Sequence, residues 1–242
     1  MTQLYLIRHG QAVCNVEPIV AGLRGDTGLT PLGVQQAEHL RDRLAATGEI
    51  KADVLIASNL PRAKQTAQIV APALGLPIMW DEEVQEMRPG EADGMTIEEA
   101  YQKYTLPNFR QNPFQQVAPG GENWPQFIIR AGTALNRITQ QHQGKTIVVV
   151  CHGGIVDASF VYFFGMSALT VPPAEFHTHN TSITYWEQYR NLDGSRRWRL
   201  QKYNDDTHLR DIGVQEAIHW EEIAARPVTG RDNPPVPLPT EE

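Results

Sequence analysis

The sequence predicts an α/β fold: a three-layer α/β/α sandwich with a mostly parallel central sheet. Short apolar runs alternate along the chain with longer stretches in which apolar residues repeat at helical spacing. Strand–helix–strand units of this kind build parallel sheets that are covered by helices on both faces. The expected strands cover about residues 3–8, 53–57, 77–80, 146–151, 182–189 and 197–203.

The helices are predicted from their caps as well as from their periodicity. Thr30 followed by Pro31 is typical of a helix start, and Gly48 is placed to end that helix. Thr96-Ile97-Glu98-Glu99 has the form of a capping box and predicts a short helix. Asp193-Gly194 predicts a hairpin between the last two strands. The expected helices start near residues 31, 61, 96, 124 and 154.

Length and composition fit one globular domain with an elaboration. The chain has 242 residues, of which 41% are hydrophobic and 20% charged. We expect the domain to cover residues 1–205, with an irregular, proline-containing insertion at about 95–121 that forms a cap over the active site. Residues 206–242 are expected to form an extension that contains a helix near 213–224 and ends in a mobile, proline-rich segment.

Charge and cysteine content narrow the functional class. A net charge of -7 gives no indication of general affinity for nucleic acid or for an anionic membrane. Cys14 and Cys151 are too few for a disulfide scaffold, and no basic-then-apolar leader precedes the first strand. We therefore expect a cytoplasmic protein that acts on a small molecule, with formation of a homo-oligomer left open.

Three of the expected strands end in residues that carry chemistry. Arg8-His9-Gly10 follows the first strand, Ser58 and Arg62 follow the second, and His152-Gly153-Gly154 follows residues 146–151. The carboxyl ends of parallel strands lie along one sheet edge, where such folds bind ligands. A cation in the first turn of a helix, as predicted for Arg62, is unfavourable by about 0.3–1 kcal/mol unless an anion is bound. These residues predict a phosphate site.

The same residues, with others in a fixed order, resemble the histidine phosphatase superfamily, also called the phosphoglycerate mutase-like family. The resemblance spans about residues 3–190. The matching positions are Arg8-His9-Gly10, Asn15, Leu29-Thr30-Pro31, Gly33, Gln36-Ala37, Ser58, Arg62-Ala63, Gln65-Thr66-Ala67, Glu86, Gly90, Gly94, Gly120-Gly121-Glu122 and His152-Gly153-Gly154.

The resemblance implies a role for each site residue. His9 would be the nucleophile that forms a phosphohistidine, and Glu86 would donate and accept the proton, with Glu83 as the second candidate. It implies neither a cofactor nor a metal, and His177 and His179 lack further ligands that would complete a metal site. The residues expected to hold the phosphate are Arg8, Gly10, Asn15, Arg62, His152 and Gly153.

Three functions remain open on this fold. The favoured one is a phosphatase acting on a small phosphorylated metabolite; the alternatives are phosphoglycerate mutase-type transfer and a catalytically silent binding or regulatory protein. Mutases of the family carry Arg-x-Tyr-Gly after the acid, whereas this chain has Met87-Arg88-Pro89-Gly90. A cysteine phosphatase would need an arginine six residues after Cys151, where Asp157 stands. The aromatic residues that could form either a substrate-selecting lid or a small core are Tyr101, Tyr104, Phe109, Phe114 and Trp124.

Overall fold

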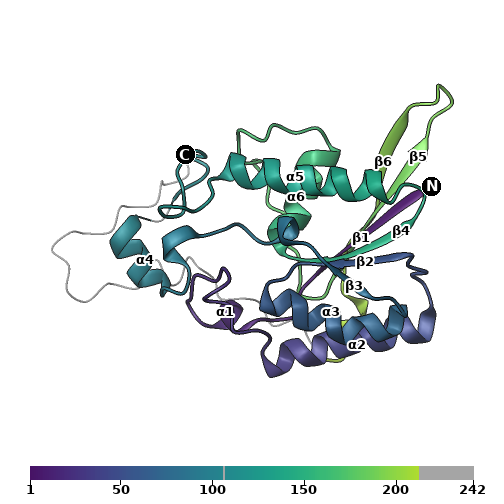
Figure 1. Ribbon diagram of the computed structural model, residues 1–242, viewed down its shortest axis with the longest axis horizontal. Coiled ribbons are helices and arrows are strands. Elements are labelled where there is room, and N and C mark those ends of the chain that lie inside the picture. Colours follow the sequence, from purple (N-terminus) through teal and green to yellow (C-terminus); the bar gives the residue numbers. More distant parts are fainter. Residues whose placement is uncertain (106, 213–242) are drawn as a thin grey trace.

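The computed structural model describes residues 1–105 and 107–212, which form an α/β fold around a six-stranded sheet (Figure 1). The strand order is β3-β2-β4-β1-β5-β6. The four strands from β3 to β1 run parallel, while β5 and β6 form an antiparallel hairpin at one edge. The expected mostly parallel sheet is confirmed. The strands are β1 (Thr2–Arg8), β2 (Val54–Ala57), β3 (Ile78–Trp80), β4 (Thr146–Cys151), β5 (Ile183–Arg190) and β6 (Arg196–Asp205).

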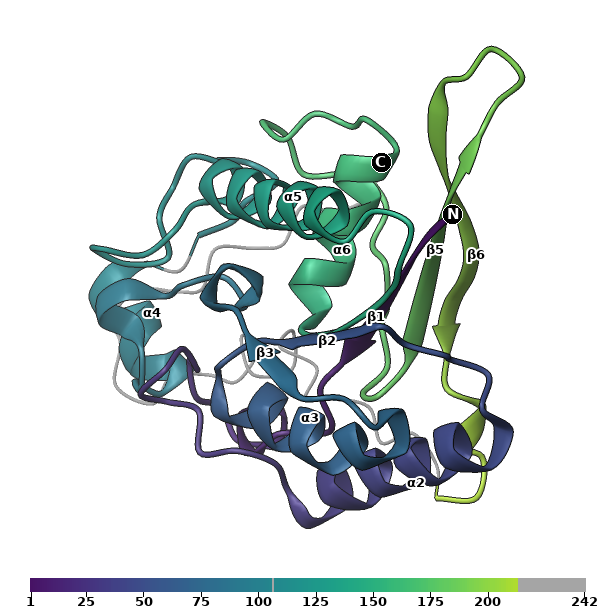
Figure 2. The ribbon, with the colours of Figure 1, turned by 45° about the vertical axis from the view of Figure 1, so that its right-hand side comes forward.

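Helices cover both faces of the sheet, as Figure 2 shows: α2 and α3 lie on one face, and α5 and α6 lie on the other. The expected caps are present, since the Thr30 side chain accepts a hydrogen bond from the Gly33 amide and Gly48 ends α2 with φ +58°. The helices are α1 (Val13–Val16), α2 (Pro31–Thr47), α3 (Pro61–Leu74), α4 (Ile97–Tyr104), α5 (Trp124–Gln141) and α6 (Gly153–Phe163).

The central strand β4 shows why the sequence folds as three layers. Its residues are all apolar from Ile147 onward and are completely buried. Ile147, Val149 and Cys151 pack into the core beneath α5 and α6, while Val148 and Val150 pack into the core beneath α2 and α3. A strand with apolar side chains in both directions must be covered on both faces.

Two segments differ from the sequence expectation. The stretch 81–94, expected as a loop, contains short 3-10 turns at Glu82–Val84 and Gly90–Ala92. Helix α1 was not predicted, because four residues are too few to show an apolar period. Ala100 and Ala118 of the insertion form a small core with Ala92, and α4 lies beside α1 on the side toward which the four parallel strands end (Figure 1).

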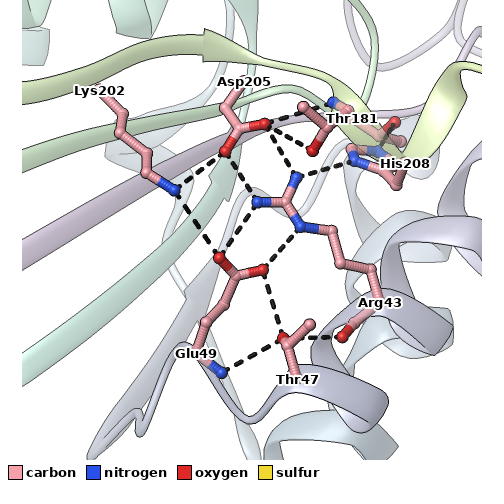
Figure 3. Close-up of polar contacts among 8 residues, drawn as sticks. Arg43, Thr47, Glu49, Thr181, Lys202, Asp205 and His208 are labelled. Carbon is pink, nitrogen blue, oxygen red and sulfur yellow. Dashed lines mark hydrogen bonds and ion pairs between the residues drawn. The ribbon is translucent and has the colours of Figure 1, made fainter.

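The residues that follow β6 stay packed on the domain. Asp205 and Glu49 both bind the Arg43 guanidinium of α2, and His208 lies against the same group (Figure 3). A 3-10 turn at Thr207–Leu209 buries Leu209. The helix expected at 213–224 and the segment expected to be mobile lie outside the described residues. None of the helices in the described part of the chain has the length and apolarity needed to span a membrane.

Candidate active site

The three strand ends that carry chemistry meet at one edge of the sheet. Arg8 of β1 pairs with Cys151 of β4, and Ala57 of β2 pairs with Val150 of β4. The residues that follow these pairs, His9, Ser58 and His152, are therefore neighbours. The rings of His9 and His152 lie with their centroids 5.2 Å apart, and both side chains are buried.

His9 is held as a neutral imidazole whose two ring nitrogens have different hydrogen-bond partners. Its Nδ1 lies 2.7 Å from the Gly10 carbonyl, and its Nε2 lies 3.1 Å from Nε of Arg62. A carbonyl can only accept and a guanidinium can only donate, so this pairing puts the proton on Nδ1 and the lone pair on Nε2. Burial, reinforced by the charges of Arg62 and Arg8, holds the pKa of His9 well below its usual value. The lone pair of the neutral ring therefore lies on Nε2, on the side of Arg62.

Arg62 is fixed by an acid that sequence reasoning missed. Its Nη1 donates to Oδ2 of Asp26 at 2.8 Å, and its backbone amide also faces that carboxylate at 3.2 Å. The ion pair is almost completely buried, with the Arg62 side chain 4% exposed and that of Asp26 0%. Oδ1 of Asp26 accepts from the Gly28 amide, so both carboxylate oxygens are used. Asp26 orients the guanidinium toward His9.

Arg8 and His152 each have a buried polar atom that no described residue satisfies. Nη1 of Arg8 donates to the Thr178 carbonyl, while Nε2 of His152 lies 2.8 Å from Oγ of Ser58. Among the described residues, Nε of Arg8 and Nδ1 of His152 are buried without a hydrogen-bond partner. Burial, followed by the charge of Arg62, holds the pKa of His152 well below its usual value. A phosphoryl oxygen would satisfy such buried polar atoms.

Glu86, rather than Glu83, lies against the site. Its Oε2 accepts from the Gly154 amide at 3.0 Å, at the first turn of α6, and its Oε1 accepts from the amide of Met87 at 2.9 Å. A Cβ at position 154 would collide with this carboxylate, which explains the second glycine after His152. Glu83 instead forms a surface ion pair with Arg88. The geometry favours Glu86 as the acid.

The other residues expected to bind phosphate are Gly10, Asn15 and Gly153, and each has contacts within the protein. The Gly10 amide donates to Oγ1 of Thr66, and a Cβ at Gly10 would overlap the Gly33 carbonyl, so Gly10 serves close packing rather than offering a donor in this conformation. Asn15 uses Oδ1 to cap the Ala12 amide, which leaves its NH₂ as the group able to reach a ligand. Gly153 is the first residue of α6 and lies against Arg8.

The model of the histidine phosphatase superfamily (branch 1) matches residues 4–206 of the chain. The chain belongs to this superfamily. Phosphoglycerate mutase-like protein 4 of Arabidopsis thaliana is 30% identical over 219 residues, which cover 89% of this chain and 90% of that protein. A probable phosphoglycerate mutase of Salmonella paratyphi C is 29% identical over 214 residues, covering 86% of this chain and 95% of the relative.

Solved structures of phosphatases in the superfamily share the fold. A phosphoserine phosphatase from Entamoeba histolytica, in complex with phosphoserine, is 26% identical with a TM-score of 0.67 and covers 86% of this chain and 100% of its own. A mycobacterial glucosyl-3-phosphoglycerate phosphatase, 24% identical with a TM-score of 0.67, covers 84% of this chain and 98% of its own, and supports the fold alone. The relatives and neighbours are thus named as phosphatases or as mutases.

The segment before β5 supports the backbone of Arg8 and His9. Nδ2 of Asn180 donates to the His9 carbonyl at 3.0 Å, and the Thr181 amide donates to the Arg8 carbonyl at 3.0 Å. Thr181 adopts φ +56°, a conformation that its β-branched side chain disfavours. Nε2 of His208 lies 2.9 Å from the Thr181 hydroxyl, and its other ring nitrogen faces the Arg43 guanidinium (Figure 3). The hydrogen bond from Asn180 joins residues that are 171 positions apart in the sequence.

Proposed function

We propose that this protein is a phosphomonoesterase that hydrolyses a small phosphorylated metabolite through a phosphohistidine intermediate on His9. The observation that carries the proposal is the position of His9 Nε2: it bears the lone pair and lies 3.1 Å from Arg62. A neutral imidazole in a buried cationic site is a competent nucleophile near pH 7, because the surrounding charges oppose its protonation.

In the first step Nε2 of His9 attacks phosphorus while the bond to the alcohol oxygen breaks. Arg8, Arg62 and His152 hold the non-bridging oxygens and stabilise the charge that develops on them. Glu86, in its acid form for this step, gives its proton to the leaving oxygen. The products of the step are the free alcohol, phosphorylated His9 and the Glu86 carboxylate.

In the second step water replaces the alcohol. The Glu86 carboxylate takes a proton from the water, whose oxygen attacks phosphorus as the bond to His9 breaks. Inorganic phosphate leaves, and both His9 and Glu86 return to their starting states. The charge stabilisation in both steps comes from side chains, so we propose that turnover needs neither a metal nor a cofactor and survives chelation by EDTA.

Phosphatase chemistry is favoured over mutase chemistry by the segment after Glu86. A mutase must hold the carboxylate of a phosphoglycerate with a cation near the acid. Arg88 is directed elsewhere, since its Nη2 lies 3.0 Å from Glu83 and its Nε lies 3.2 Å from Gln85. The mutase-like names among the relatives make phosphoglycerate isomerisation the activity to test in parallel.

The experiment is to trap the intermediate. Brief incubation with a ³²P-labelled phosphomonoester should give protein-bound label that is lost in acid, kept in base and absent in His9→Asn. His142→Asn, a substitution at the end of α5, is the matched control and should label fully. Release of phosphate by His9→Asn at the rate of the parent protein would refute covalent catalysis. Transfer of the phosphoryl group between the positions of phosphoglycerate, without release of phosphate, would show a mutase instead of the proposed phosphatase.

A further inference from the structure

Beside the site, α6 lines a cavity of about 320 Å³, called here the α6 cavity. One wall is the α6 face that carries Asp157, and another is Trp124 at the start of α5. The loop before β5 closes it with Val171, Glu175, Phe176 and His177. The Trp124 indole donates to the Thr170 carbonyl at 3.2 Å, which ties α5 to this loop.

Helix geometry places the α6 cavity next to the proposed acid. Asp157 follows Gly154 by three residues and Gly153 by four, and residues at these spacings share one helix face. The Gly154 amide binds Glu86, while Gly153 lies against Arg8. His177 precedes Thr178, whose carbonyl accepts from Arg8. Because Glu86 must reach the leaving oxygen, the organic group of the substrate lies on this side of the phosphate.

Asp157 carries an acceptor that the described residues do not satisfy. Its Oδ1 is buried without a hydrogen-bond partner in the described part of the chain. Burial, reinforced by the negative charge of Glu86, raises the pKa of Asp157 to about 7, with Arg8 acting in the opposite direction. An acceptor that is buried and unpaired is unfavourable, and a donor on a ligand would relieve it.

The charges that line the α6 cavity are negative. Asp157 contributes a buried carboxyl group. Glu175 contributes a carboxylate that is exposed and pairs at 2.8 Å with Arg110, which lies outside the cavity lining. Trp124 and Phe176 add aromatic surface that suits a carbon frame or an ammonium group. A substrate carboxylate would meet like charge here, whereas a hydroxyl or ammonium donor would find an acceptor.

We propose that the α6 cavity binds the alcohol part of the substrate, with Asp157 accepting a hydrogen bond from a hydroxyl or ammonium group, so that esters of alcohols without a carboxylate are preferred. The proposal rests on the proposed phosphatase function and adds its substrate class. It places the selection of the substrate on α6, one turn after the residues that border the phosphate.

Matched pairs of esters test the proposal on the full chain. Glycerol 3-phosphate differs from 3-phosphoglycerate only by a hydroxymethyl group in place of the carboxylate, and phosphoethanolamine differs from phosphoserine only by the missing carboxylate. We expect kcat/KM to favour the carboxylate-free member of each pair at least tenfold. At about pH 8.5, where Asp157 of the parent protein is ionised, the preference should contract at least fivefold in Asp157→Asn, because the repelling charge is removed. Asp42→Asn, at an exposed position on α2, should keep the preference unchanged.

The outcomes separate this proposal from the proposed function. If His9 is labelled and esters are hydrolysed, but the carboxylate-bearing members are turned over equally well or the preference survives in Asp157→Asn, the α6 proposal is overturned and the phosphatase stands. If no ester labels His9 and none releases phosphate, both proposals fail together. A contracted preference in Asp157→Asn with full His9 labelling supports both.

Discussion

Replacing Asp157 with asparagine should make the folded protein more stable, and increasingly so as the pH rises. The side chain is largely buried, its Oδ1 has no partner among the described residues, and its pKa is raised from 3.8 to about 7. The folded state therefore keeps a proton on Asp157 over a pH range in which the unfolded chain has lost it. Ionising this group in the folded state is unfavourable, whereas asparagine has nearly the same shape and no charge.

The size and sign follow from the shift. Between about pH 4 and 7 the native state binds one proton more than the unfolded state, so the free energy of unfolding falls as the pH rises. A rise of about 3 pKa units corresponds to roughly 4 kcal/mol, at about 1.4 kcal/mol per unit. Because an asparagine side chain does not titrate, the gain of the variant over the parent protein should grow to about 2–4 kcal/mol by pH 8.5.

Urea unfolding of the parent protein, Asp157→Asn and Asp42→Asn at pH 4.5 and pH 8.5 measures this difference. The advantage of Asp157→Asn should be larger at pH 8.5 than at pH 4.5, while Asp42→Asn should show no such growth. If Asp157→Asn were less stable than the parent at pH 8.5, or if its difference were the same at both pH values, the carboxylate would be satisfied in the native state. Its unpaired oxygen would then carry no cost for folding, contrary to the reasoning above.

Three further predictions concern the site and its support. Asp26→Asn leaves the buried Arg62 without its counter-ion, so we expect the free energy of unfolding, measured in urea, to fall by about 3 kcal/mol and kcat/KM to decrease. An unchanged kcat/KM would mean that Asp26 is not needed to orient Arg62. Glu86→Gln should slow the hydrolysis of alkyl phosphates about 100-fold and that of p-nitrophenyl phosphate far less, because p-nitrophenolate leaves without a proton. Equal losses on both substrates would mean that another residue is the acid. Arg43 holds the pKa of Asp205 well below its usual value, so Asp205→Asn should lower the free energy of unfolding by about 1–2 kcal/mol at pH 7. Acid titration monitored by circular dichroism should show this deficit shrinking below about pH 4, where Asp205 of the parent protein becomes protonated. A deficit that stays constant with pH would exclude the ion pair as its cause.

The parts of the fold that the sequence predicts are those that depend on local patterns, such as apolar runs and helix caps. Strand β4 is expected at 146–151 and lies there, because five consecutive apolar residues followed by histidine and two glycines allow few other structures. Helix α2 begins at Pro31 and ends before Gly48, as its cap residues indicate. The meeting of His9 with His152 follows from the rule that parallel strands end at a common edge.

Contacts between distant segments could not be predicted in the same way. Asp26 lies in Gly25-Asp26-Thr27-Gly28, which looks like an ordinary polar turn, and its partner Arg62 is 36 residues away. Thr181 gives no sign in the sequence that its amide will support the Arg8 carbonyl across a strand pairing. Such roles depend on how loops close over the sheet edge, and the path of a loop does not follow from a regular spacing of apolar residues.

Asp157 is a different case, because a signal was present. In the sequence, position 157 attracts notice only for the arginine that it lacks. The spacing of three and four residues from Gly154 and Gly153 already places Asp157 on the helix face that borders the phosphate. Of the aromatic residues considered for a lid, Trp124 lines the α6 cavity, whereas Phe114 is 59% exposed at the surface.

In the proposed mechanism, opposite charges on the two sides of the site would separate catalysis from substrate specificity. Arg8 and Arg62 surround the proposed phosphate position and keep His9 neutral, whereas Glu86, Asp157 and Glu175 line the side from which the alcohol would leave. Since α6 contributes its first turn to the phosphate side and its second turn to the alcohol side, a change at position 157 can alter the preferred alcohol without moving His9. A stabilising Asp157→Asn substitution that also loses substrate preference would show that Asp157 is kept for function at the expense of stability.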